Sequence, residues 1–251
     1  MILADRLVKR FAGRTAVNQV SFEVKVGEVL GFLGPNGAGK TTTMRMIAGC
    51  LEPDEGRALV NGCDSALQRR AAQEQLGYLP EGAPAYPAMT PRGFVRFGLR
   101  ARGFSGSALN DAAEMALRLA NLGPAANKPI GALSKGYKRR AALAAAIAHD
   151  PPVLILDEPT DGLDPNQKDG VRALITEMAA TKAIIISTHL LDEVDAICTR
   201  AVVIAGGEVL ADDTPQGLAT LGSDETIASA FRALTQAKGE TLGRARGGRA
   251  A

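Results

Sequence analysis

Two kinds of strand pattern occur early in the chain. Apolar and polar residues nearly alternate over residues 20–26, and residues 29–33 form a short apolar run. Alternation is typical of a strand buried on one face, and a short apolar run is consistent with a strand buried on both faces. Similar apolar runs at residues 153–156 and 183–187 predict two more buried strands. Shorter strands are expected at residues 57–61 and 77–79, and a hairpin is expected at residues 202–205 and 208–211.

Helical spacing dominates the middle of the chain. Apolar residues recur at intervals of three and four over residues 94–102 and 108–120. Helical stretches at residues 42–50 and 165–180 lie between predicted strands, and this alternation favours a mainly parallel sheet with crossover helices. The sequence therefore predicts an α/β fold with an inserted helical subdomain at about residues 82–149.

Length and composition restrict the domain organisation. The chain has 251 residues, of which 46% are hydrophobic and 22% charged, the balance of one large globular domain. We expect this domain to span residues 1–236. Residues 237–251 are rich in glycine and carry Arg244, Arg246 and Arg249, so we expect them to form a disordered basic tail.

Composition also disfavours several locations and partners. The longest uninterrupted apolar stretch, residues 141–148, is far shorter than the roughly 20 residues that a membrane-spanning helix needs. The first residues include Asp5 and lack the basic and apolar segments of a secretory signal, so we expect a cytosolic chain. A net charge of +2, spread along the chain, gives no strong case for nucleic acid as a partner.

A glycine-rich segment follows the strand predicted at residues 29–33. It reads GPNGAGKT over residues 34–41 and leads into a predicted helix. Glycines allow successive backbone N–H groups to turn toward a phosphate, and the helix N-terminus adds its dipole. Lys40 is then placed to reach the β- and γ-phosphates of a nucleotide, and the Thr41 hydroxyl to bind Mg²⁺. The order of strand, loop and helix indicates a Walker A motif rather than an ordinary glycine turn.

Two acids end the buried strand predicted at residues 153–156. In a parallel sheet, Asp157 at the carboxyl end of this strand would lie beside the phosphate loop and hold Mg²⁺. Glu158 would then polarise an attacking water as a general base. Taken alone, the two acids fit a strand that meets a solvated loop equally well, but with a phosphate loop in the same chain they indicate a Walker B motif.

Three further polar residues are candidates for function or structure. His189 follows the strand predicted at residues 183–187, at the sheet edge where site residues collect. Ser134 is suited to cap an Ala-rich helix whose free N–H groups would meet a phosphate, although the segment taken alone favours an ordinary capped helix with a basic first turn. His149 is interpreted as a structural residue stabilised by the dipole at the end of that helix.

Taken in order, these motifs resemble the nucleotide-binding domain of ABC transporters. The resemblance spans roughly residues 3–236 and includes LSKGY at residues 133–137, DGLDP at 161–165 and STH at 187–189. It implies a P-loop NTPase core with a mainly parallel sheet, an N-terminal antiparallel β portion and an inserted helical subdomain. The implied activity is ATP hydrolysis, with ATP and Mg²⁺ bound, coupled to transport by a membrane-spanning subunit on a separate chain. The resemblance further implies a homodimer that closes over ATP at the cytoplasmic face of the membrane.

The resemblance also implies residue roles. Lys40, Glu158 and His189 are expected to be catalytic, and Thr41, Asp157 and Glu81 to hold Mg²⁺. Phe11 resembles the aromatic residue that stacks on adenine, while its interpretation as a core phenylalanine on an edge strand stays open. Asp164 resembles an aspartate at the dimer interface. Residues expected to contact ATP are Phe11, Gly34, Pro35, Asn36, Gly37, Ala38, Gly39, Lys40, Thr41 and Thr42, with Ser134 and Gly136 contributed by the opposite subunit.

Three positions depart from the commonest family pattern. Glu81 stands where glutamine is usual; its carboxylate suits Mg²⁺, but a solvated loop acid facing the membrane subunit is the alternative. Lys135 replaces a glycine and Tyr137 a glutamine in the signature segment. These variants, with residues 227–235, resemble the branch associated with drug, polysaccharide and gliding-motility exporters. Two other classes share the nucleotide motifs: a soluble ABC-type ATPase acting on nucleic acid or ribosomes, and a regulatory module that binds ATP without hydrolysing it.

Overall fold

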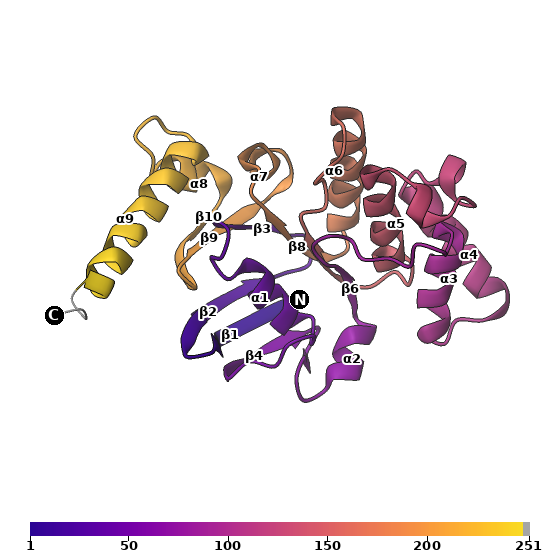
Figure 1. Cartoon of the computed structure of the whole chain (residues 1–251), viewed down its shortest axis with the longest axis horizontal. Helices are drawn as coiled ribbons and strands as arrows, with labels where there is room; N and C mark the ends of the chain where they lie inside the picture. Colours follow the sequence, from indigo (N-terminus) through magenta and orange to yellow (C-terminus); the bar gives the residue numbers. More distant parts are fainter. Residues whose placement is uncertain (248–251) are drawn as a thin grey trace.

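Two β-sheets form the centre of the molecule in the computed structural model, which describes residues 1–247, with side chains through residue 238 (Figure 1). The smaller sheet is antiparallel, with the order β2-β1-β4-β5. The larger sheet has the order β10-β9-β3-β8-β7-β6, and all its strands are parallel except β10. The strands are β1 (Ile2–Phe11), β2 (Arg14–Val24), β3 (Val29–Leu33), β4 (Glu55–Val60), β5 (Cys63–Asp64), β6 (Leu76–Leu79), β7 (Val153–Asp157), β8 (Ala183–Thr188), β9 (Arg200–Ala205) and β10 (Glu208–Asp213).

Helices cover the large sheet, and further helices lie beyond both of its ends (Figure 1). Three helices between β6 and β7 lie at one end of the molecule, and the last two helices lie at the other. Within residues 1–247, no helix has both the length and the hydropathy that crossing a membrane requires. The helices are α1 (Lys40–Ile47), α2 (Arg69–Glu74), α3 (Pro91–Ala101), α4 (Gly106–Leu119), α5 (Lys135–Ile147), α6 (Pro165–Ala179), α7 (Leu191–Ile197), α8 (Pro215–Ala219) and α9 (Ile227–Gly247), with short 3-10 turns at Gly123–Ala125 and Ile130–Ala132.

Alternate residues of the parallel strands face two different hydrophobic layers. Leu154 and Leu156 of β7 belong to one cluster, which includes residues of helices α3 to α6. Val153 and Ile155 belong to the other cluster, with residues of α1 and of the small sheet. Because both faces are buried, the strand is apolar throughout, and the first polar side chain appears where it ends, at Asp157.

Local capping signals set where several helices begin. The Thr90 hydroxyl accepts a hydrogen bond from the Gly93 N–H at 3.0 Å, and Pro91 occupies the first turn of α3. Asp164 caps α6 in the same way, accepting from the Gln167 N–H at 3.0 Å. Such caps satisfy N–H groups that the helix itself leaves free.

The fold class expected from the sequence is confirmed: a mainly parallel sheet, an antiparallel N-terminal sheet and an inserted helical segment are all present. The inserted helices begin at α3, later than residue 82, and share one hydrophobic cluster with the large sheet. That residues 82–149 form a subdomain of their own stays a prediction. The residue pattern gave no bounds for strand β1, although an N-terminal antiparallel portion was expected, because bulges near Arg6, which has a φ of 47°, interrupt its alternation.

The expectation of a disordered tail from residue 237 is wrong for residues 237–247, which continue helix α9. The residues before them already anchor this helix, because Leu234 packs on the large hydrophobic cluster. Lys238 pairs with Glu208 on β10. Residues 248–251 lie outside the described part of the chain.

Candidate functional site

The carboxyl ends of four neighbouring parallel strands meet at one edge of the large sheet. In the register, Leu33 of β3 lies beside Thr188 of β8, and Asp157 of β7 beside Ser187. Leu79 of β6 lies beside Leu156. The loops that follow these strands carry residues 34–39, Glu81, Glu158 and His189, so segments far apart in sequence converge where ligands bind in such sheets.

The glycine loop after β3 lies close to neighbouring backbone. A Cβ atom at Gly34 would lie 2.4 Å from the Ile204 carbonyl oxygen, and one at Gly39 would lie 2.6 Å from that of Ala16. Gly39 also has a φ of 108°, a left-handed conformation that side chains disfavour. These positions require glycine, and the turn that they allow ends directly at the first residue of α1, Lys40.

A cavity of about 370 Å³ lies over this loop. Phe11 borders it at the end of β1 and is 47% exposed, which does not fit the alternative of a core phenylalanine. The residues that line the cavity are Phe11, Ala16, Asn36, Gly37, Ala38, Gly39, Lys40, Thr41, Thr42, Glu81, Asp157 and Glu158.

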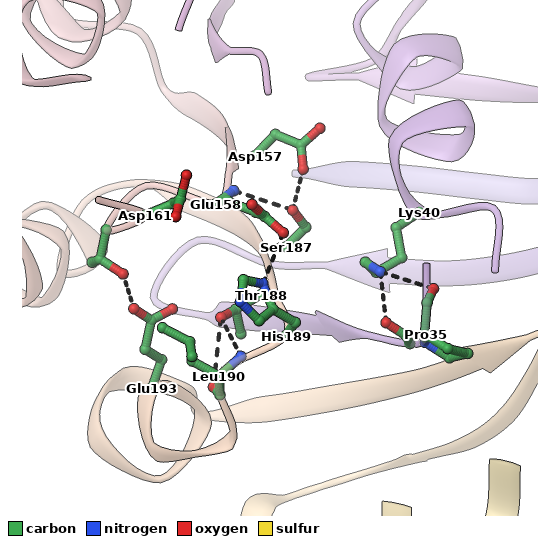
Figure 2. A network of polar contacts seen from close by, with 12 residues as sticks. Pro35, Lys40, Asp157, Glu158, Asp161, Ser187, Thr188, His189, Leu190 and Glu193 are labelled. Carbon is green, nitrogen blue, oxygen red and sulfur yellow. Dashed lines mark hydrogen bonds and ion pairs between the residues drawn. The ribbon is translucent and has the colours of Figure 1, made fainter. Parts of the chain in front are cut away.

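Lys40 is the cation of the cavity, and it is buried. Its ammonium donates hydrogen bonds to the carbonyl oxygens of Gly34 at 2.6 Å and Pro35 at 3.1 Å (Figure 2). Burial lowers the pKa of Lys40, and the carboxylates of Glu158, Asp157 and Glu81 oppose that shift. A desolvated ammonium held by two carbonyl groups is positioned to bind an anion in the cavity.

Asp157 has one carboxylate oxygen occupied and one free. Its Oδ1 accepts a hydrogen bond from the Ser187 hydroxyl (Figure 2). Its Oδ2 is buried and has no hydrogen-bond partner among the described residues. A buried carboxylate oxygen without a partner is costly unless a cation or a water meets it. With the Thr41 hydroxyl and the Glu81 carboxylate lining the same cavity, the residues fit a hard divalent cation such as Mg²⁺.

Glu158 and His189 form a polar pair between β7 and β8. Nδ1 of His189 lies 2.9 Å from Oε1 of Glu158 (Figure 2). The Glu158 N–H donates to the Ser187 carbonyl oxygen at 3.1 Å, and Glu158 has a φ of 51°. Left-handed non-glycine residues are often found at functional sites, where the surrounding structure holds them. The backbone of Glu158 is thus held between the two strands, and its side chain meets His189 at the edge of the first cavity.

A second cavity, of about 380 Å³, adjoins the first and contains the histidine. Asn36, Glu81 and Glu158 line both cavities. Gly34, Pro35 and His189 line only the second, together with Leu191 and Phe231. Phe231 belongs to α9, and sequence reasoning gave it no role because nothing in the sequence relates the terminal helix to the motifs. Ser187 was likewise passed over, although it lies within the STH motif.

The signature residues lie away from both cavities. Ser134 caps α5, and neither it nor Gly136 contributes to either lining. Lys135 forms an ion pair of 2.8 Å with Asp161. The Tyr137 ring packs against the Arg140 guanidinium, whose central carbon lies 4.2 Å from the ring centroid. The two unusual signature residues, Lys135 and Tyr137, thus contact other residues of their own chain. That Ser134 and Gly136 contact ATP from the opposite subunit stays a prediction.

His149 makes a structural contact, as expected, but the cause of its stabilisation differs from the one expected. It lies just after α5, and its Nε2 is 3.1 Å from the Leu76 carbonyl oxygen. Burial, with the positive charge of Arg102 as a second cause, lowers the pKa of His149 to about 4. The imidazole is therefore neutral at pH 7, so stabilisation of a charged His149 by the helix dipole is wrong.

Known proteins share this sequence pattern and fold. A family model described as ABC transporter matches residues 17–161. The Nod factor export ATP-binding protein I of Burkholderia orbicola (strain AU 1054) is 37% identical, over 93% of this chain and 82% of its own length. The linearmycin resistance ATP-binding protein LnrL of Bacillus subtilis (strain 168) is 34% identical, over 94% of this chain and 77% of its own length.

Two solved structures resemble the fold. One, described as the ATP-binding subunit of an ABC transporter, has a TM-score of 0.85 at 27% identity and covers 93% of this chain and 99% of that one. A bacterial ABC transporter cassette solved as a dimer has a TM-score of 0.79 at 25% identity, covering 85% of this chain and 98% of that one.

Proposed function

This chain belongs to the ABC transporter family, and on that basis we propose that it is the ATP-binding and ATP-hydrolysing subunit of an exporter. The observation that carries the proposal is the meeting of Lys40, Asp157 and Glu158 around one cavity, with His189 beside it. The names of the relatives favour export, since one refers to Nod factor export and another to linearmycin resistance. The membrane-spanning part belongs to a separate polypeptide, and this subunit acts at the cytoplasmic face of the membrane.

Binding of ATP uses the glycine loop and Phe11. The backbone N–H groups of residues 36–41 and the Lys40 ammonium hold the phosphates, and the half-exposed Phe11 ring stacks on the adenine. Thr41, Asp157 and Glu81 would hold Mg²⁺, which supplies positive charge against the phosphates when it is bound. The unpartnered Oδ2 of Asp157 supports this assignment.

Hydrolysis uses the pair at the strand ends. Glu158 accepts the proton of the attacking water, and His189 donates a hydrogen bond to the γ-phosphate. The contact between them fixes the direction of both side chains before ATP arrives. Phosphoryl transfer depends mainly on such positioning and on charge neutralisation. These residues therefore supply the types of group that an ATPase needs.

A second copy of the chain completes each site. Ser134 and Gly136 lie outside the cavities of their own chain, and a similar cassette is a dimer in its solved structure. Two copies therefore face each other head to tail, and the signature segment of each closes on the ATP held by the other. Asp164, at the start of α6, lies at this interface.

The membrane subunit contacts residues 81–91 and helix α3 in this proposal. Tyr86 and Phe97 are 53% and 46% exposed, and their ring centroids are 5.7 Å apart. Exposed aromatic pairs of this kind are typical of surfaces that a partner covers. A soluble ATPase acting on nucleic acid or ribosomes remains the alternative function, and it predicts no membrane protein bound at this surface.

Complementation between two inactive variants tests the shared site. Glu158→Gln removes the base of one copy, and Ser134→Arg blocks the signature segment of the other. Mixed dimers then contain one site with Glu158 and Ser134 both intact, so the mixture should regain up to about a quarter of the wild-type phosphate-release rate, because half of randomly formed dimers are mixed. A mixture that hydrolyses no more than the sum of its components would overturn the dimeric site.

A further inference from the structure

Helix α7 contains a buried carboxylate that the proposed mechanism does not use. Glu193 is only 1% exposed and lies four residues after His189. Burial raises the pKa of Glu193, and the neighbouring Thr188 side chain opposes that rise. Burial of a carboxylate costs free energy unless its oxygens are paired. The position of Glu193 beside the site therefore needs a structural explanation.

The carboxylate of Glu193 pairs with the segment that follows the Walker B acids. Its Oε1 accepts a hydrogen bond from the Thr160 hydroxyl. Figure 2 draws this contact as the dashed line that ends on Glu193. Thr160 is 1% exposed and lies two residues after Glu158. The exposed acid Asp192 already supplies a negative charge to the first turn of α7, so the helix dipole alone does not account for Glu193.

This contact joins the two chain segments that carry the polar pair. At one side, the Glu158 N–H is bonded to the Ser187 carbonyl oxygen, which ties β7 to β8 just before the loops begin. Farther along, Glu193 in the first turn of α7 accepts a hydrogen bond from Thr160, which lies inside the loop after β7, two residues beyond Glu158. His189 lies between Ser187 and Glu193 in the sequence, and so between the two connections. Between them, Thr188 Oγ1 accepts from the Leu190 N–H at 3.0 Å, which fixes the turn into α7.

We propose that Glu193 is a positioning residue for ATP hydrolysis, which holds His189 against Glu158 through its hydrogen bond with Thr160. His189 is half-exposed, with 53% of its side chain accessible, so packing alone does not fix its ring. A displacement of about 1 Å in such a pair is enough to lower a rate by roughly 100-fold. The inference rests on the ATPase function proposed above.

The sharpest test changes Thr160 rather than the acid itself. Thr160→Val keeps the shape of the side chain and removes the donor, whereas Thr160→Ser keeps the hydroxyl. We expect Thr160→Val to lower kcat for ATP hydrolysis by roughly 10-fold or more while KM for ATP stays within about twofold, because the phosphate loop is on other elements. Thr160→Ser should restore kcat. Glu193→Gln, which retains an acceptor oxygen, should lie between the two.

A nucleotide-free measurement separates positioning from a general loss of structure. The chain has two histidines, so imidazole resonances in a ¹⁵N-labelled sample report His189 and His149 separately, with His189→Gln for assignment. We expect Thr160→Val to shift the His189 resonance and leave that of His149 in place. Unchanged kcat, a reduced kcat with an unmoved His189 resonance, or equal movement of both histidines would each overturn the proposal. A wild-type chain without ATPase activity would instead overturn the proposed function, and the resonance test would still apply.

Discussion

Nδ1 of His189 lies 2.9 Å from Oε1 of Glu158, and this contact joins the ends of two parallel strands that are separated by about 30 residues of sequence. Neither residue depends on the other for its backbone position, because β7 and β8 are held in register by their own ladder. The sheet therefore sets the backbone positions of the pair, and the contact between the two side chains is what Glu193 and Thr160 are proposed to hold. The chemistry of the pair gives the first prediction.

Replacing Glu158 by glutamine should separate ATP binding from hydrolysis. The amide keeps the size of the side chain but cannot accept a proton from water, so hydrolysis should fall by roughly 100-fold or more. ATP binding should remain, and an ATP-dependent dimer should accumulate on size-exclusion chromatography. Glu177→Gln, at an exposed position on α6, is the matched control and should hydrolyse normally. A Glu158→Gln chain that stays monomeric with ATP and keeps the wild-type rate would show that both the base and the dimer are assigned wrongly.

Replacing Lys40 by alanine should weaken ATP binding by roughly 100-fold, as expected for the loss of charged hydrogen bonds to the phosphates. The same ammonium bonds to the Gly34 and Pro35 carbonyl oxygens, so the loop itself should also loosen. Titration with a fluorescent ATP analogue measures the loss, with the exposed Lys25→Ala as control. Near-normal affinity in Lys40→Ala would rule out the assigned phosphate site.

Replacing Glu81 by glutamine should raise the Mg²⁺ concentration that gives half-maximal hydrolysis by a few-fold, because a neutral amide is a weaker ligand for a hard cation. Nucleotide binding measured without Mg²⁺ should change little. The residue lines both cavities, which is the basis of this expectation. If the two chains give the same Mg²⁺ titration and differ only in the assembled transporter, Glu81 instead faces the membrane subunit.

His149 should make the folded state sensitive to mild acid. Its pKa falls from an ordinary value of 6.5 to about 4 on folding, so the unfolded chain binds the proton more tightly. Stability contributed by the neutral imidazole is complete above pH 6.5 and is lost as the pH falls toward 4. Because the ring is partly exposed, we expect roughly 1 kcal/mol at pH 5 after allowing for solvent screening.

Urea unfolding at pH 7.5 and pH 5 would measure this effect. His149→Gln removes the titrating group and keeps a donor toward the Leu76 carbonyl oxygen. The wild-type chain should lose more unfolding free energy between the two pH values than the variant does. Equal losses in both chains would mean that His149 is charged in the folded state or does not titrate in this range.

The end of helix α9 should be dispensable for hydrolysis, unlike its beginning. Phe231 lines the cavity that contains His189, and Leu234 packs on the hydrophobic cluster. A chain that stops after Gly239 keeps both residues and should retain the wild-type phosphate-release rate. A chain that stops after Thr226 lacks Phe231 and Leu234, and it should lose both stability and activity. Lost activity in the longer truncation, with its unfolding curve unchanged, would contradict this division.

Sequence alone determined the chemistry that is carried by contiguous segments. The phosphate loop, the acids that end β7 and the histidine that ends β8 were all identified, because each sits at a fixed distance from a strand whose apolar run is visible. Their convergence also followed, since parallel strands place their carboxyl ends at one edge. The α/β fold class was predicted for the same reason.

Contacts between segments without a shared local signal were decided only by the tertiary structure. The Glu193–Thr160 hydrogen bond, the place of Phe231 beside His189 and the buried, neutral His149 depend on how helices pack over the sheet. A carboxylate in a helix has the same sequence pattern whether it is solvated or buried, so Glu193 gave no signal. Burial and the partners that compensate for it are properties of packing, and packing is set by the whole chain rather than by any local segment of it.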